Sequence, residues 1–134
     1  MQTFLPLNDF TASAAVLDRA RLGKQRIEAK QLIHAICHGG GWSNHPAARM
    51  WRGYVPALAA YGICVCQVWR ERGYRDSVQP FFFSYLTEDY DLPPWLGDPA
   101  FHASHRSNLL RKAPAHYAQF GWLEPNDLPY VWPV

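Results

Sequence analysis

The chain has 134 residues, of which 49% are hydrophobic, and this is enough for one domain around one core. Its formal net charge of +2 excludes an overall basic character, so affinity for nucleic acid would have to come from a local cluster of cations. No stretch approaches the roughly 18 continuous apolar residues that span a membrane, and the N-terminus lacks the pattern of a targeting segment. We therefore expect a cytoplasmic protein with a single domain over residues 1–134.

The first half of the chain predicts an extended arm followed by two helices. Residues 1–9 contain a proline and no helical periodicity, and Asn8 or Asp9 can cap a short helix over residues 10–17. Asp18 is placed to cap a longer helix over about residues 19–37. Apolar residues recur along that helix at helical spacing, at Leu22, Ala29, Ile33 and Ile36. The Gly39–Gly41 run ends it.

Two further helices are expected before residue 73. Pro46 suits a first helical turn, and Ser43 or Asn44 can cap the helix that it begins. A longer helix is expected over about residues 54–72, with an apolar face and with Gly73 as its end. These elements make the first half of the chain helical throughout.

The second half is less regular. Residues 79–101 are rich in proline and aromatic residues, which predicts an irregular segment on the core that holds at most a short helix. Helices are expected over 103–110 and 114–120, and an aromatic, proline-rich tail ends the chain. The fold class is therefore all-α, a compact single-domain helical bundle with a long ordered C-terminal wrap.

Cysteine usage favours a reducing compartment. The chain has three cysteines, an odd number that favours free thiols. Cys64 and Cys66 would lie on different faces of a helix, and no second pair of Cys or His residues has zinc spacing. No metal site is expected.

A cluster of cations surrounds one acidic residue on the predicted helix 19–37. Glu28 lies at the border of the apolar stripe, and the cations on this helix are Arg19, Arg21, Lys24, Arg26 and Lys30. Such a stripe can hold phosphates. Cleavage of a glycosidic bond builds positive charge on the sugar, and a fixed carboxylate at Glu28 would stabilise that charge. The alternative is a surface glutamate in ordinary helical ion pairs.

Other polar residues are candidates for binding or chemistry. Asn44 and His45 precede a helix and can contact a phosphate or a base, or simply cap that helix. His105 and Arg106 belong to a polar segment for which we favour phosphate contacts over a metal, with a capped helix start as the alternative. Lys24 is either an amine nucleophile of lowered pKa or an ordinary phosphate-binding lysine.

Aromatic residues offer a further means of contact with nucleic acid. Aromatics make up 15% of the chain, and their rings either pack in the core or stack on bases. The pattern does not separate the two roles for the candidates Trp42, Trp51, Tyr130 and Trp132.

Two motifs in a fixed order resemble a known family. The first is Leu17-Asp18-Arg19-x-x-Leu22 followed by Glu28-Ala29, and the second is Gly41-Trp42-x-Asn44-His45-Pro46 followed by a helix ending Arg70-Glu71-Arg72-Gly73-Tyr74. Together they are similar to the pyrimidine-dimer DNA glycosylase family, especially its shorter bacterial branch. The resemblance covers roughly residues 1–76, and the segment around His105 and the tail look typical of that branch.

The resemblance implies a cofactor-free, all-α enzyme whose partner is damaged or modified duplex DNA. Enzymes of this kind flip a nucleotide out of the duplex, attack C1′ with an N-terminal α-amine, form a Schiff base and cut the strand by β-elimination. Glu28 matches the essential glutamate of the family. Arg19, Arg21, Lys24 and Arg26 match its DNA-contacting region in kind, and the pocket would be lined by Asn44, His45, His105 and Arg106.

The chain departs from the family at the nucleophile. Gln2 is bulky, and processing enzymes usually leave the initiator methionine before such a residue. The attacking amine would then be that of Met1, with Lys24 as the fallback. The leading hypothesis is a DNA glycosylase with an AP-lyase step; the alternatives are a non-catalytic protein that binds DNA or a modified nucleotide, and a different enzyme acting on modified pyrimidines. Nothing in the sequence indicates an obligate protein partner.

Overall fold

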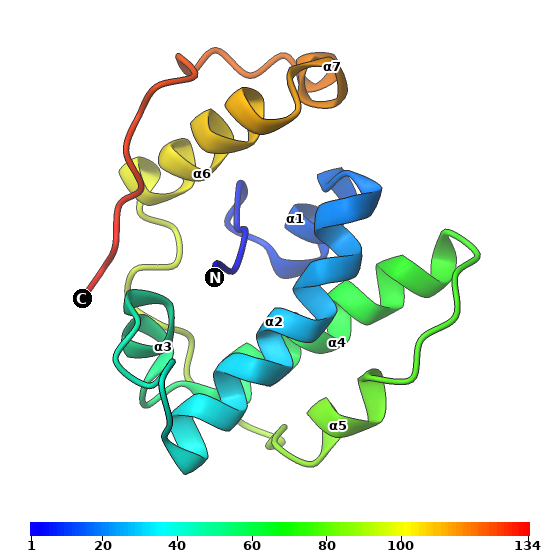
Figure 1. Ribbon diagram of the computed structural model, residues 1–134, viewed down its shortest axis with the longest axis vertical. Helices are drawn as coiled ribbons and strands as arrows, with labels where there is room; N and C mark the ends of the chain where they lie inside the picture. The colour runs from blue at the N-terminus through cyan, green and yellow to red at the C-terminus, as the bar shows by residue number, and fades with distance from the viewer.

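The computed structural model describes residues 1–134, and all of its regular elements are helices, which confirms the all-α prediction (Figure 1). In chain order they are α1 (Phe10–Val16), α2 (Arg19–His38), α3 (Pro46–Trp51), α4 (Val55–Glu71), α5 (Gln79–Phe83), α6 (Pro99–Lys112), α7 (Pro114–Tyr117) and the 3₁₀ helix η1 (Ala118–Phe120). None of these helices is long and apolar enough to cross a membrane.

The first two helices begin and end where local sequence signals predict. The Asp9 carboxylate accepts a hydrogen bond from the Ala12 N–H at 2.7 Å and caps α1. Asp18 occupies the cap position of α2, but its side chain makes no cap bond and is used elsewhere. Gly39 ends α2 with a φ of 80°, a conformation that glycine adopts without strain.

The core forms where α2 crosses α4. Leu22, Ala29 and Ile33 of the predicted stripe are fully buried, and Leu32 joins them. Close packing extends to α5 at Gly62, where a Cβ atom would lie 2.4 Å from the Phe82 ring. Glycine at this position therefore lets α5 pack directly on α4.

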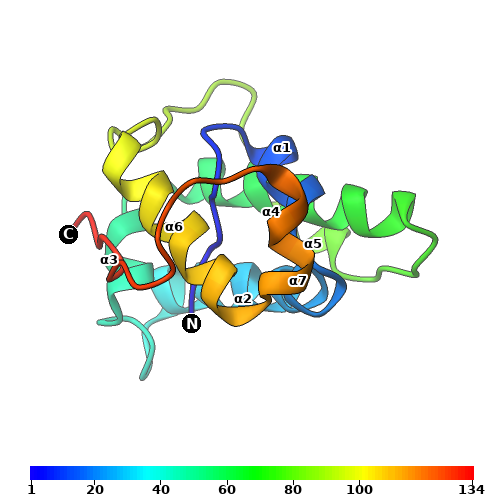
Figure 2. The ribbon, with the colours of Figure 1, turned by 90° about the horizontal axis from the view of Figure 1, so that it is seen from above.

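The second half of the chain is more helical than its composition suggests. The region predicted as irregular contains the five-residue helix α5. Helix α6 begins at Pro99, four residues before the predicted start at 103, because Asp98 accepts a cap bond from the Ala100 N–H. After η1 the chain runs back along α6 as an extended tail toward α3, which forms the predicted wrap (Figures 1 and 2).

The N-terminal arm lies inside the molecule. Residues 2–6 are all buried, and the arm passes between α2 and α6 (Figures 1 and 2). Phe4 and Leu5 belong to the same core of 27 buried residues as the helices. The start of the chain is thus placed by elements from both halves of the sequence.

Candidate active site

Gln25 fixes the arm against α2. Its Oε1 accepts hydrogen bonds from the Phe4 N–H at 2.9 Å and from the Tyr61 hydroxyl at 2.6 Å. Its Nε2 donates to the Gln2 carbonyl at 2.8 Å and to the Glu28 carboxylate at 3.1 Å. One side chain therefore sets the position of the chain start and of the candidate catalytic glutamate. The sequence pattern did not identify this residue, because its partners lie in other parts of the chain.

His105 and Arg106 hold the other side of the arm and are not in the lining of the pocket that contains Glu28, so their contact with DNA stays a prediction. His105 is fully buried, and its Nδ1 accepts a hydrogen bond from the Leu5 N–H at 2.9 Å. Burial lowers the pKa of His105 to about 3, so the ring is neutral. Arg106 donates to the Pro6 carbonyl at 2.7 Å and forms an ion pair with Glu124. Both side chains are committed to structure.

Glu28 is half-buried, and two donors converge on one of its carboxylate oxygens. Oε2 accepts the Gln2 N–H at 3.3 Å and the Gln25 Nε2–H at 3.1 Å, whereas Oε1 accepts no hydrogen bond. No ion pair involves this carboxylate. Glu28 is therefore oriented by neutral donors and keeps one oxygen free for another partner.

Glu28 lies in a pocket of about 430 Å³ that brings together residues far apart in sequence. Predicted site residues in its lining are Met1, Arg21, Lys24, Glu28, His45, Tyr130 and Trp132. The lining also contains Gln2, Phe4, Ala20 and Lys112. Lys112 lies in the last turn of α6, and only the fold places it opposite α2.

Met1 and His45 meet Glu28 in this pocket. Met1 is half-buried, and its α-amine makes no ion pair. Burial lowers the pKa of His45, the positive α-amine lowers it further, and the Glu28 carboxylate opposes them. These electrostatic effects require the amine, the imidazole and the carboxylate to be near one another. The site thus combines an acid, an amine and an imidazole.

His45 itself caps α3, which corrects the expectation that Ser43 or Asn44 does so. The His45 Nδ1 accepts a hydrogen bond from the Ala47 N–H at 3.0 Å, and Pro46 occupies the first turn as predicted. Asn44 is exposed and does not line the pocket. Because the His45 imidazole already accepts the Ala47 N–H, α3 needs no cap from Ser43 or Asn44.

The pocket cations differ in their surroundings. Arg21 donates to both carboxylate oxygens of Asp18 at 3.2 Å, and the Tyr117 hydroxyl donates to the same carboxylate at 2.5 Å. Burial alone would raise the pKa of Asp18, but these hydrogen bonds and the Arg21 charge lower it below its usual value. Lys24 is exposed and makes no ion pair. Lys24 is therefore available to a ligand, as is Lys112, which is also exposed and unpaired.

A neighbouring groove continues along α2 and shares Lys24 and Glu28 with the pocket. Arg19 lines this groove, with its guanidinium 5.1 Å from the Tyr74 ring. Arg26 forms an ion pair with Asp76 at 2.7 Å and lies 5.0 Å from the Trp69 ring. We expect Arg26 to contribute less to DNA contact than the sequence predicts, because its charge is paired with Asp76.

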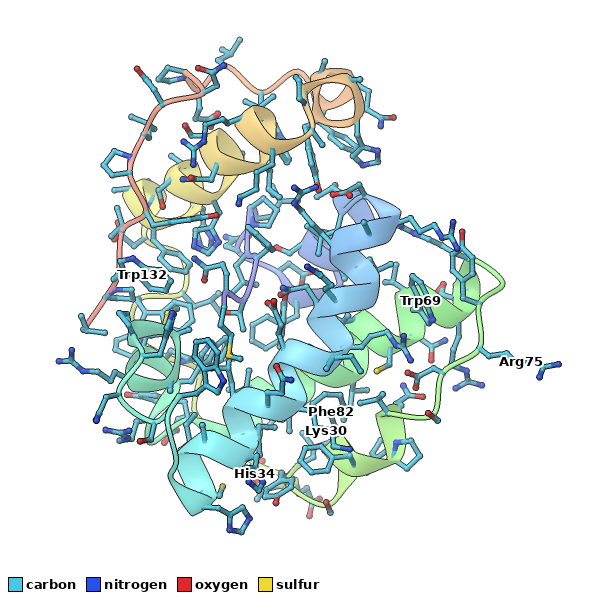
Figure 3. All side chains as sticks on the ribbon, viewed as in Figure 1. Lys30, His34, Trp69, Arg75, Phe82 and Trp132 are labelled. Carbon is cyan, nitrogen blue, oxygen red and sulfur yellow. The ribbon has the colours of Figure 1, made fainter.

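Aromatic residues of the tail form one wall of the pocket. The tail is fastened to α6, where the Val131 N–H donates to Ser104 Oγ at 3.1 Å. Trp132 packs edge-on against His45 at the start of α3, with ring centres 5.7 Å apart. Figure 3 labels Trp132 in the C-terminal tail beside α3. Tyr130 packs between Trp132 and His105. Trp51, in contrast, is fully buried in the core.

No three His, Cys, Asp or Glu side chains converge so as to hold a metal ion, and the three cysteines are free. The fold and the pocket define an all-α protein with an amine and a carboxylate in one cation-lined cavity. Residues 1–79 match the family model described as pyrimidine dimer DNA glycosylase, and the chain belongs to this family. This confirms the resemblance seen in the sequence and makes the protein, at the level of its family, a DNA-repair glycosylase. Comparisons with curated proteins and with solved structures gave no match.

Proposed function

We propose that the protein is a DNA glycosylase with an AP-lyase step that acts on damaged or modified pyrimidines in duplex DNA. One observation supports this function most directly: Glu28 accepts the Gln2 N–H at 3.3 Å, so the catalytic carboxylate and the start of the chain share one pocket. A carboxylate and an amine in one pocket are the two groups that this chemistry needs.

In the proposed reaction, the Met1 amine attacks C1′ of an extruded nucleotide while the bond to the base breaks. Positive charge develops on the sugar as that bond lengthens, and the free oxygen of Glu28 stabilises it. An amine attacks through the electron pair of its neutral form, and no ion pair holds the Met1 amine in this pocket. The resulting Schiff base permits strand cleavage by β-elimination.

Phosphates of the DNA would contact the exposed cations of the pocket and the adjoining groove. Lys24 borders both cavities, Arg21 lines the pocket and Arg19 lines the groove. Tyr130 and Trp132 offer aromatic faces against which a base can stack. Asn44 is exposed, and we expect it to contact the DNA outside the pocket.

Borohydride trapping on duplex DNA with an abasic site tests the amine chemistry. A covalent adduct is expected with the native chain and is expected to disappear when the α-amine is acetylated. The Lys24→Gln variant should still form the adduct, because Lys24 supplies charge and not the nucleophile. Loss of the adduct in that variant alone would identify Lys24 as the nucleophile. Salt-dependent binding without any adduct would contradict the proposal and support the non-catalytic alternative.

Glu28→Gln tests the role of the carboxylate. We expect the variant to fold normally and its turnover to fall by at least about 100-fold, because a charge partner of the transition state is lost. Glu71→Gln, at an exposed position on α4, is the matched control and should retain activity. Unchanged turnover of Glu28→Gln would remove this residue from the mechanism.

A further inference from the structure

The imidazole of His45 is held in one orientation in the pocket. Its Nδ1 accepts the Ala47 N–H at 3.0 Å, which ties the ring to the first turn of α3. The ring also lies edge-on between two indoles, with its centre 5.5 Å from that of Trp42 and 5.7 Å from that of Trp132. A ring fixed by a hydrogen bond and by two aromatic neighbours loses little freedom when it contacts a ligand.

This hydrogen bond also selects the tautomer. An Nδ1 that accepts a hydrogen bond uses its lone pair, so the proton of the neutral ring is on Nε2. The Nε2–H has no partner in the protein. Burial and the nearby α-amine lower the pKa of His45 and keep the ring neutral near pH 7. His45 therefore presents one unused donor and no free acceptor.

Glu28 and the Met1 amine serve the sugar side of the reaction. Glu28 can only accept, and the Met1 amine must supply an electron pair. A departing pyrimidine takes the electron pair of the broken bond, and this negative charge spreads from N1 to the C2 carbonyl oxygen. A fixed N–H aimed at that oxygen would stabilise the charge, as donors do at other developing oxyanions.

Building on the proposed function, we propose that His45 donates its Nε2–H to the C2 carbonyl oxygen of the departing pyrimidine. The amine lone pair forms the new bond to C1′, and the C1′–N1 electron pair leaves with the base. The new secondary ammonium then loses one proton, which Glu28 passes to the departing base. His45 keeps its own proton throughout, so the imidazole acts as a neutral donor and is not consumed.

His45→Ser separates this role from helix capping, because serine caps helices well but has no donor that reaches as far as Nε2. Cleavage of the C1′–N1 bond, called base release below although the freed thymine stays joined to its neighbour in the dimer, is measured in a single turnover on duplex DNA with one thymine dimer, as alkali-labile strand breaks. Schiff-base formation is measured by borohydride trapping on abasic-site duplex, where no base remains to depart. We expect base release to fall by about 100-fold and adduct formation to fall by less than about threefold.

The two assays also separate this inference from the proposed function. Absence of an adduct and of base release with the native chain would overturn both. If the native chain is active, equal losses in the two assays for His45→Ser would overturn the inference alone, because His45 would then act on the amine or on the fold. Unchanged base release would overturn it as well. A smaller loss for a pyrimidine that carries an electron-withdrawing group, and so departs more easily, is the expected supporting result.

Discussion

At the scale of single residues, Gln25 shows how a buried polar side chain organises the site. It is 1% exposed and makes four hydrogen bonds, two through each end of its carboxamide. A glutamine within a helix is compatible with either face by propensity, so the sequence contains no indication of these partners. Its contacts reach the arm, α4 and Glu28, and only the folded chain brings these together.

Replacing Gln25 by leucine should destabilise the protein. The Phe4 N–H and the Gln2 carbonyl would remain buried without partners, so we expect a loss of about 2–4 kcal/mol in the free energy of unfolding. Urea denaturation measures this change. Gln31→Leu, at an exposed position of the same helix, is the control and should change stability by less than about 0.5 kcal/mol. Equal effects of the two substitutions would contradict the role of the Gln25 hydrogen bonds in stability.

His105 should make folding sensitive to acid. Burial holds the pKa of His105 at about 3 in the folded chain, below the ordinary histidine value of 6.5. Between these values the unfolded chain binds a proton that the folded chain does not, so stability falls as the pH drops. The slope contributed by this residue approaches about 1.4 kcal/mol per pH unit. Urea midpoints at pH 7 and 5 should show this fall, and His105→Gln should reduce it, whereas the exposed His34→Gln should not.

At the scale of elements, α2 combines an inner face that the sequence predicts well with an outer face that it predicts only in part. The apolar stripe identifies the buried side, because helical periodicity reports burial directly. The cations of the outer face look alike in sequence, yet Arg26 is paired with Asp76 whereas Lys24 is not. The partner, fifty residues away in the chain, decides which charge is available.

Substitutions on α2 should therefore separate DNA binding from stability. Lys24→Gln is expected to weaken binding to duplex DNA. The negative slope of log K against log salt should become shallower by about 0.9, the value for one phosphate contact. Arg26→Gln should leave that slope unchanged and lower the urea midpoint, because it strands the Asp76 carboxylate. Arg75→Gln is the control and should leave both the salt slope and the urea midpoint unchanged, since this side chain extends away from the body of the molecule (Figure 3). An unaltered slope for Lys24→Gln would show that it does not touch phosphate.

At the scale of the whole molecule, the family-matched segment packs against residues from the second half of the chain. Residues 1–79 hold the motifs, but the arm needs His105 and Arg106, and the core needs Phe101 and Leu109. The fragment 1–79 is expected to lack a cooperative urea transition by circular dichroism. A sharp transition with native helicity would show that the rest of the chain is dispensable for folding.

Much of the helical framework could be predicted because capping residues, prolines and periodicity are local signals. The start of α6 was misplaced because Asp98-Pro99 lies at the end of a proline-rich segment that hides its capping pattern. The residues that line the pocket were harder to predict than the helices. The expectation that Met1 and Glu28 share a site followed from the family resemblance. The place of Lys112 in the pocket and the hydrogen bonds of Gln25 to the arm depend on long-range packing, which no local pattern encodes.

The enclosed arm has a consequence for the order in which the newly made chain matures. The Leu5 backbone is fixed by a side chain 100 positions later, so the first segment to leave the ribosome has to wait for α6. At translation rates of about 5–20 residues per second this delay is on the order of 5–20 seconds. During that interval the future pocket does not exist, and the chain start remains accessible to any modifying enzyme that reaches it.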